Sequence, residues 1–150
     1  MPDEIMPLLR GWPQIGAAEQ AFPFLSVDAD GFPHSALLSR AELEPGADGT
    51  GLLAIIASTR TRSNLMRSRA AGLIAIDGTV CHRMKLALTA WIADGSDLLG
   101  CVFTVTGHTP DDIGVPMRPL TFRPTRELAE MENWRRGDRL FTRLREELPR

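Results

Sequence analysis

Short strand-like runs separated by Asp and Gly turns recur along the chain, and this pattern constrains the fold more than any other feature. The clearest case is FPFLSVDADGFPHSALLSRAEL (22–43), in which two apolar runs flank a DADG turn, as in a β-hairpin. Further turn sequences lie at 44–51, 77–78 and 94–97. A parallel sheet would need a helix after nearly every strand. The pattern therefore predicts a mainly β protein built as a small antiparallel barrel.

Six strand-like runs can be distinguished. The third run, LLAIIAS, is apolar throughout, as expected for a strand that is covered on both faces. The fifth run alternates, so one face carries Val80, His82, Met84, Leu86, Leu88, Ala90 and Ile92. The predicted strands cover residues 22–27, 33–43, 52–58, 73–77, 79–93 and 98–108.

Helical sequence is confined to three places. One or two short helices are expected within residues 1–20, and another begins near Thr59. The tail, 125–148, is helical, with a break expected at Gly137. We expect one domain, 1–150, whose barrel core covers about 22–123. The apolar stripe of the tail consists of Leu140, Phe141, Leu144 and Leu148.

Composition argues against several classes of function. The net charge of −2 gives no general attraction to nucleic acid, and the N-terminus lacks the basic residues of a signal peptide. No stretch approaches the ~20 apolar residues of a membrane span, so we expect a soluble, cytoplasmic protein. Cys81 and Cys101 are isolated, and His34, His82 and His108 lie in different segments, which disfavours a zinc site. His82 is expected in the core, bonded to a backbone carbonyl.

The segment ASTRTRSNL (57–65) concentrates polar groups where an apolar strand meets a predicted helix. The start of a helix exposes unpaired N–H groups and carries partial positive charge, so it binds anions such as phosphate. A second interpretation is that the hydroxyls only cap the helix and the arginines are solvated. The residue types leave both interpretations open. The groups concerned are the hydroxyls of Ser58, Thr59, Thr61 and Ser63 and the guanidinium groups of Arg60 and Arg62.

Three stretches of the chain, within about residues 22–106, resemble the FMN-binding split-barrel family related to pyridoxamine 5'-phosphate oxidase. They are FLSVDADGFPHSALLSRAEL, LLAIIASTRTRSNLMRSRAAGLIAI and VCHRMKLALTAW. The first is similar to the family's opening hairpin, and the second to its strand, Ser-Arg-Lys stretch, short helix and following strand. The matching positions are Asp30, Gly31 and Pro33 in the hairpin and Thr59, Arg60, Thr61, Asn64 and Leu65 at the helix.

The resemblance implies a six-stranded antiparallel split β-barrel with Greek-key connections and short N-terminal, inter-strand and C-terminal helices. It also implies a homodimer with FMN at the subunit interface, each phosphate on the strand-to-helix corner and each ring against the second strand. The cofactor-binding residues that it implies are Ser58, Thr59, Arg60, Thr61, Arg62 and Asn64 at the phosphate, the backbone near Ser35, Ala36 and Leu37 beside the ring, and Arg83 near the flavin.

The chain also departs from the family. Thr61 stands where the family often has lysine, and Ala36 lies among apolar residues where the true oxidases carry basic ones. We therefore expect an FMN-dependent oxidoreductase that acts on an unknown small molecule and is not a pyridoxamine phosphate oxidase. No catalytic residue is assigned, since the bound cofactor would carry the chemistry. The alternative is a non-catalytic protein with the same barrel that binds a flavin, a deazaflavin or haem.

Overall fold

A computed structural model of the chain describes residues 1–46 and 49–148, so part of the turn predicted at 44–51 lies outside the described residues. None of the helices in these two stretches is long and apolar enough to cross a membrane. The elements are α1 (Met6–Leu9), β1 (Glu19–Gln20), β2 (Phe22–Val27), β3 (Pro33–Leu38), β4 (Leu43–Pro45), β5 (Gly51–Ile56), α2 (Thr59–Ser68), β6 (Ala70–Asp77), β7 (Val80–Asp94), β8 (Leu98–Asp112), β9 (Thr121–Phe122), α3 (Arg126–Met131) and α4 (Trp134–Glu147).

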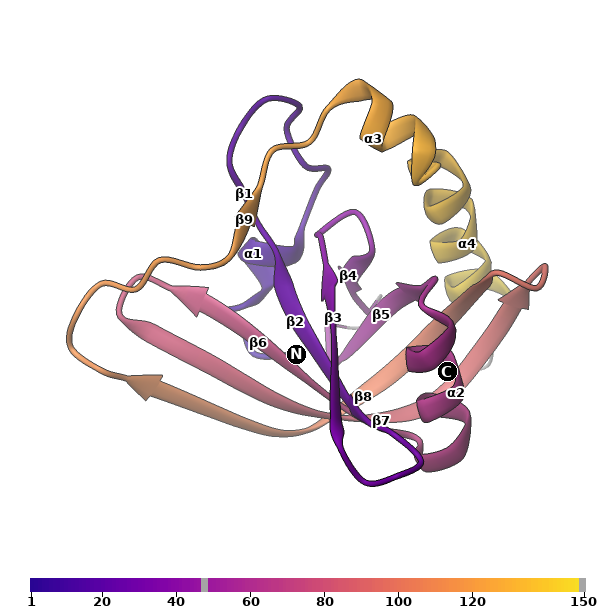
Figure 1. Ribbon diagram of the computed structural model, residues 1–150, viewed down its shortest axis with the longest axis horizontal. Coiled ribbons are helices and arrows are strands. Elements are labelled where there is room, and N and C mark those ends of the chain that lie inside the picture. Colours follow the sequence, from indigo (N-terminus) through magenta and orange to yellow (C-terminus); the bar gives the residue numbers. More distant parts are fainter. Residues whose placement is uncertain (47–48, 149–150) are drawn as a thin grey trace.

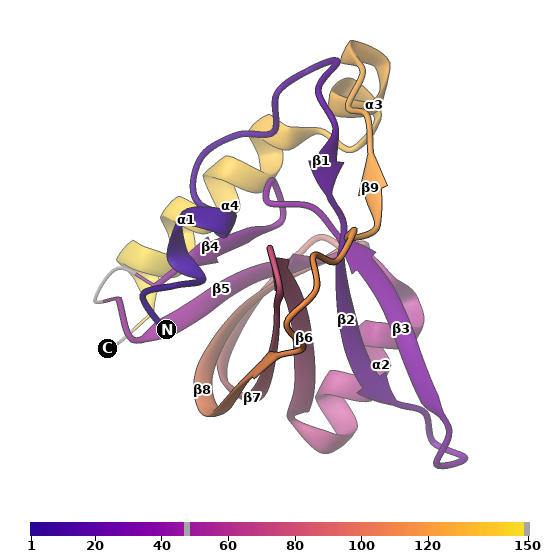
Figure 2. The same cartoon turned by 90° about the vertical axis from the view of Figure 1, so that its left-hand side faces the viewer.

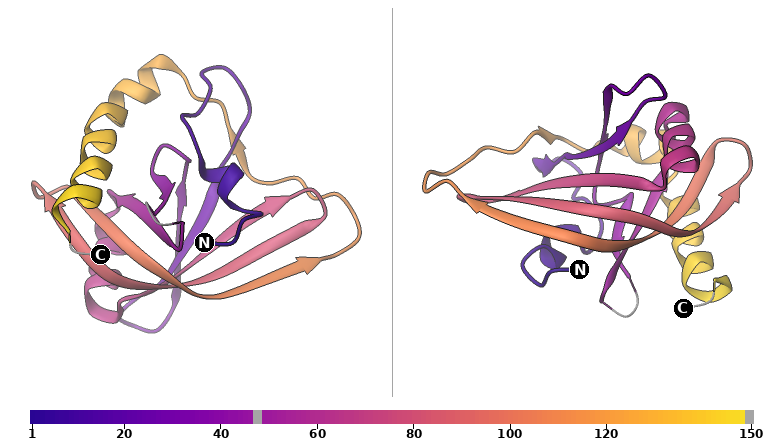
Figure 3. Two further views of the ribbon diagram at one scale, coloured as in Figure 1. Left: turned by 180° about the vertical axis from the view of Figure 1, so that it is seen from behind. Right: turned by 90° about the horizontal axis from the view of Figure 1, so that it is seen from below.

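The main sheet is antiparallel and strongly curled (Figures 1 and 2). Its order is β3-β2-β6-β7-β8-β5-β4, which makes seven strands, so the prediction of six was wrong. The long strands β7 and β8 form its centre (Figure 3), and register shifts at Lys85/Leu86 and Leu88/Ala90 interrupt their pairing. Such bulges increase local twist, which suits a sheet that bends back on itself. A separate two-stranded sheet joins β1 to β9.

The extra strand comes from a turn inside the segment predicted as one strand, 33–43. The chain turns between Ser39 and Glu42, where the Ser39 backbone N–H and the Ser39 hydroxyl donate to Glu42 Oε1 over 3.1 and 3.2 Å. The Glu42 N–H donates in turn to the Ser39 carbonyl. As a result β3 and β4, which are consecutive in sequence, lie at opposite edges of the sheet.

The core lies on both sides of β5, as the apolar run predicted. On one side, Ile5 and Leu9 of the N-terminal segment join the apolar residues of the curled sheet, among them Phe24 and Phe103. The two rings of this phenylalanine pair lie 5.7 Å apart.

The alternation predicted for β7 is confirmed from residue 82 to residue 88, where the even-numbered residues are all buried. Outside this stretch it weakens, because Val80, Ala90 and Ile92 are only half-buried and Cys81, on the opposite face, is buried.

The other side of β5 is covered by α4 (Figure 1). Leu140, Phe141 and Leu144 of this helix pack on Leu53 and Ile55. The stripe predicted from the tail sequence is therefore covered within the same chain.

The break in the C-terminal helical region lies before Trp134, so the prediction of a break at Gly137 was wrong. Asn133, at φ 51°, separates α3 from α4, and its side chain accepts from the Arg136 N–H. Gly137 lies inside α4, where an added Cβ would be 3.3 Å from Ile55 Cδ1. The glycine thus lets the helix approach the sheet closely.

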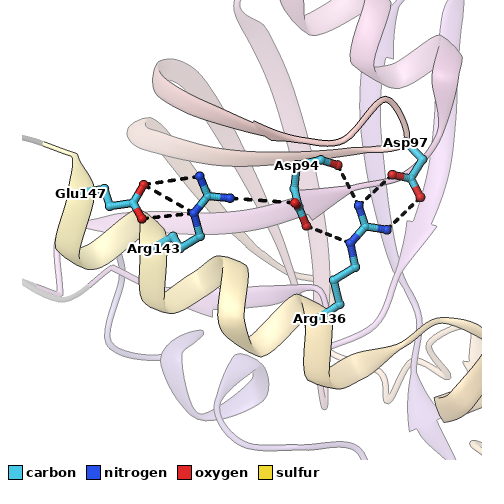
Figure 4. Close-up of polar contacts among 5 residues, drawn as sticks. All are labelled: Asp94, Asp97, Arg136, Arg143 and Glu147. Atoms are coloured by element: carbon cyan, nitrogen blue, oxygen red, sulfur yellow. Dashed lines mark hydrogen bonds and ion pairs between the residues drawn. The ribbon is translucent and has the colours of Figure 1, made fainter.

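Charged side chains tie α4 to the turn between β7 and β8 (Figure 4). Arg136 donates to the carboxylate of Asp94 and, through two nitrogens, to that of Asp97, each over 2.8 Å. Arg143 bonds to Glu147 one turn further along the helix, and its guanidinium lies 3.9 Å from Asp94. This network fixes the turn at 95–97, which also contacts α2 as described below.

Candidate functional site

The corner between β5 and α2 is organised by Ser58. Its hydroxyl oxygen accepts from the backbone N–H of Thr61 over 3.3 Å and from the Thr61 hydroxyl over 3.1 Å. Its carbonyl accepts from the Arg62 N–H. The two N–H groups before these, those of Thr59 and Arg60, precede the helical hydrogen bonds, so neither has a partner within the helix. The first turn of α2 is therefore both capped and open.

The inner face of α2 holds the helix against β2. Thr61 is fully buried, and Asn64 is 2% exposed. The Asn64 amide donates to the Ser26 hydroxyl over 3.0 Å and to Asp28 Oδ1 over 2.9 Å, while its oxygen accepts from Arg67. Of the residues predicted to contact phosphate, Thr61 and Asn64 are thus engaged inside the protein.

The outer face of α2 borders a hollow of about 620 Å³ beside the turn that joins β2 to β3. Arg60 is one of its two basic groups, with 67% of the side chain exposed and Nη1 3.7 Å from Asp28 Oδ2. The turn adds Asp28 and Asp30 to the same wall, so two carboxylates face two arginines here. Besides these aspartates and Ala29, the lining residues are Thr59, Arg60, Ser63, Asn64 and Arg67.

Arg62 turns to the other side of α2. Its Nη1 donates to the Ser96 carbonyl over 2.7 Å, and its Nη2 donates to the Thr59 hydroxyl over 3.3 Å. Its buried Nε has no acceptor among the described residues. This guanidinium joins α2 to the turn that Arg136 holds from α4, and it lines a second hollow, of about 660 Å³.

Strand β3, which carries the three residues predicted beside the ring, is an edge strand (Figure 2). It pairs with β2 on one side, with Ala36 opposite Phe24, and α2 lies next to both strands. The outer row of its backbone N–H and C=O groups is therefore open to a ligand or a second chain. Ser35 and Leu37 are exposed, the latter by 57%.

Arg83 is not brought to this corner. It is exposed on β7, where its Nη1 forms an ion pair with Asp111 Oδ2 over 3.0 Å. It lines neither of the hollows beside α2.

Comparison with solved structures identifies the architecture. No protein-family model and no curated protein sequence matches the chain. An F420 reductase superposes with a TM-score of 0.54 at 14% identity, covering 73% of this chain and 98% of its own. The styrene monooxygenase flavin reductase of Pseudomonas putida S12 gives 0.51 at 12%, covering 71% and 87%. The chain has the split-barrel fold of these reductases.

A third split barrel links the fold to the family named from the sequence. It is a protein related to general stress protein 26, of the pyridoxinephosphate oxidase family, from Clostridium acetobutylicum. It superposes with a TM-score of 0.50 at 14% identity, covering 70% of this chain and 86% of its own. The resemblance drawn from the sequence is therefore confirmed at the level of the fold.

Several residues around the corner of this split barrel were not assigned as site residues from the sequence. Ser63 was named only as a candidate hydroxyl donor, and Arg67 was not named as a candidate. Both follow Thr59 at intervals of four, which places all three on one helix face, and this spacing is the signal that could have found Arg67. The hairpin turn brings Asp28 and Asp30 to the hollow. The sequence predicts this turn, but no local pattern indicates that it lies beside α2.

The split barrel also contains a histidine pair away from α2. His82 is buried as predicted, but its partner is His108 and not a carbonyl, with 2.9 Å between His82 Nδ1 and His108 Nε2. Burial, together with the neighbouring His82, lowers the pKa of His108. Within residues 1–46 and 49–148, no three His, Cys, Asp or Glu side chains gather as a metal site would require.

Proposed function

We propose that the protein is a flavin-dependent oxidoreductase that binds FMN at the corner between β5 and α2. The observation that carries this proposal is the open first turn of α2, where the N–H groups of Thr59 and Arg60 and the exposed Arg60 guanidinium border a hollow. A phosphate there would accept from backbone donors at the positive end of a helix and from a charged side chain. The Thr59 and Ser63 hydroxyls add further donors.

The edge strand β3 supports placing the flavin ring beside Ser35, Ala36 and Leu37. The pyrimidine edge of the ring carries alternating N–H and C=O groups, which match the free backbone groups of an edge strand. Leu37 at 57% and Phe32 at 69% are exposed large apolar side chains on the same hairpin. A second copy of the chain that covers them would complete the homodimer, with the ring between the subunits.

Bound FMN would supply hydride or electron transfer at its ring. The chain's own residues would then fix the phosphate, hold the edge of the ring and limit the access of water. The substrate in this proposal is a small molecule, and no side chain is assigned a catalytic role.

The test is flavin binding to the purified protein and to Arg60→Ala. Bound FMN gives an absorption band at about 450 nm, whereas a deazaflavin gives one at about 420 nm. Loss of a charged phosphate contact costs about 1.5 to 3 kcal/mol, so the variant should bind FMN roughly 10- to 150-fold more weakly. Arg118→Ala is the matched control, because Arg118 is exposed and lines neither hollow beside α2. Equal weakening in both variants, or in neither, would exclude the assignment of Arg60.

A second candidate is a non-catalytic protein that binds a small ligand at the same corner. It is favoured by Asp28 and Asp30, whose carboxylates oppose a phosphate in the hollow, and by the uncharged, buried Thr61. Oxidation of reduced nicotinamide in the presence of flavin separates the two functions. Turnover supports the enzyme, and flavin binding without turnover with any donor supports the binding protein.

A further inference from the structure

The second hollow beside α2 differs in its chemistry from the first. It lies between α2 and the turn that joins β7 to β8, and it has a volume of about 660 Å³. No carboxylate lines it. Its principal side chains are Thr59, Arg62, Ser63, Met66, Arg67 and Trp91.

Trp91 gives this hollow an aromatic wall. The indole is 36% exposed, and the Arg69 guanidinium carbon lies 4.2 Å from the centre of its ring. This cation–π contact holds the indole in place. Met66, 37% exposed, lines the same hollow with an adaptable thioether. A planar base can stack on such a wall.

A nucleotide also needs hydrogen-bond donors for its phosphate groups, and the same hollow provides them. Arg62 and Arg67 have no carboxylate within 4 Å in the part of the chain that the structure describes, so their charges are not neutralised by an ion pair. Guanidinium groups in this state favour phosphate oxygens, and the Thr59 and Ser63 hydroxyls add neutral donors.

The two hollows share a ridge on α2. Thr59, Ser63 and Arg67 line both of them, so a diphosphate seated on this ridge would lie between the two. We propose that the second hollow binds the adenosine end of a dinucleotide, with the adenine against Trp91 and the diphosphate on the ridge. The assignment to a cofactor rests on the proposed flavin site. The adenosine diphosphate part is common to FAD and to the nicotinamide dinucleotides.

The first experiment uses ADP as the probe, because it carries this shared part alone. Calorimetric titration should show ADP binding to the full chain, weakened at least about 5-fold by Trp91→Leu and largely retained by Trp91→Phe, which keeps an aromatic ring. Trp12→Leu is the matched control, since Trp12 is 47% exposed and lines a different hollow. Absence of ADP binding to the wild-type protein, or equal affinity in Trp91→Leu and wild type, overturns the proposal.

The second experiment distinguishes the two sources of the adenylate. Tighter binding of FAD than of FMN, with the difference removed by Trp91→Leu, assigns the hollow to the flavin cofactor. Equal binding of FAD and FMN, together with NADH binding that is sensitive to Trp91→Leu, assigns it to the electron donor. If neither ligand depends on Trp91, the inference is wrong. FMN binding without ADP binding rejects only this inference, and ADP binding without FMN binding rejects only the proposed flavin site.

Discussion

Replacing Glu42 by glutamine is predicted to stabilise the fold at alkaline pH and to leave it almost unchanged in acid. Burial raises the pKa of the Glu42 carboxyl from its ordinary value of 4.5 to about 7, and the charge of Glu132 adds to this increase, while the hydrogen bonds from Ser39 oppose it. A glutamine oxygen can accept both of the bonds that Ser39 donates to Oε1. The Glu42→Gln variant therefore removes the ionisation and keeps the turn.

The pKa of Glu42 sets both the size of the effect and its pH range. Below about pH 4.5 the carboxyl is protonated in the folded and the unfolded chain alike, so it does not affect stability. As the pH rises to about 7, the unfolded chain has lost a proton that the folded chain retains, and the free energy of unfolding falls. The difference between a pKa of 4.5 in the unfolded chain and about 7 in the folded chain lowers the free energy of unfolding at alkaline pH by about 3 kcal/mol, at about 1.4 kcal/mol per pKa unit.

Urea unfolding followed by tryptophan fluorescence, at pH 5 and at pH 8, measures this effect. The Glu42→Gln variant should exceed the wild type by about 3 kcal/mol at pH 8 and by much less at pH 5. Glu130→Gln is the control, because Glu130 is exposed and lines the same hollow as Glu42, under α3 and α4. Equal stability of Glu42→Gln and wild type at both pH values would show that the folded protein holds the carboxylate at no cost, and the reasoning would fail.

Two further predictions concern packing. An added Cβ at Gly51 would lie 2.7 Å from the carbonyl oxygen of Phe103, whose backbone is paired in the sheet. Gly51→Ala should therefore lower the free energy of unfolding, measured by urea titration, by about 1 to 3 kcal/mol. An unchanged urea midpoint would contradict this close approach. Leu140 is 1% exposed where α4 packs on β5. Leu140→Ala should lower the free energy of unfolding by about 2 to 5 kcal/mol and lower the melting temperature in calorimetry. An unchanged melting temperature would mean that α4 does not pack on the sheet.

The parts of the fold that could be predicted from the sequence are those in which local pattern and burial coincide. The hairpin of β2 and β3 follows from its Asp and Gly turn, and the pairing of Phe24 with Ala36 confirms it. The alternation in β7 predicted that His82 and Met84 are buried, because successive side chains of a strand point to opposite faces.

The parts that failed depend on tertiary contacts. The turn from Ser39 to Glu42 contains neither Gly nor Pro and relies on side-chain hydrogen bonds, so the segment looked like one strand. Glycine is a poor helix former, which is why Gly137 was predicted to break the helix. It lies inside α4 instead, where the absence of a side chain lets the helix pack closely against Ile55.

The candidate site shows the same division. The sequence was sufficient to locate a corner rich in anion-binding groups, since helix starts and their capping residues have local signatures. It could not show which groups face outward. Thr61 and Asn64 are drawn inward by Ser58 and by β2, and these contacts exist only when α2 has docked on the sheet.

The contribution of the flavin phosphate is measured by comparing the affinities of FMN and of riboflavin, which lacks the phosphate, for the wild type and for Arg60→Ala. If the first turn of α2 holds the phosphate, wild-type protein should bind FMN at least about tenfold more tightly than riboflavin, and most of this difference should disappear in the variant. Equal affinity of the wild type for the two flavins would exclude a phosphate site at the corner between β5 and α2, because the phosphate would then contribute nothing to binding.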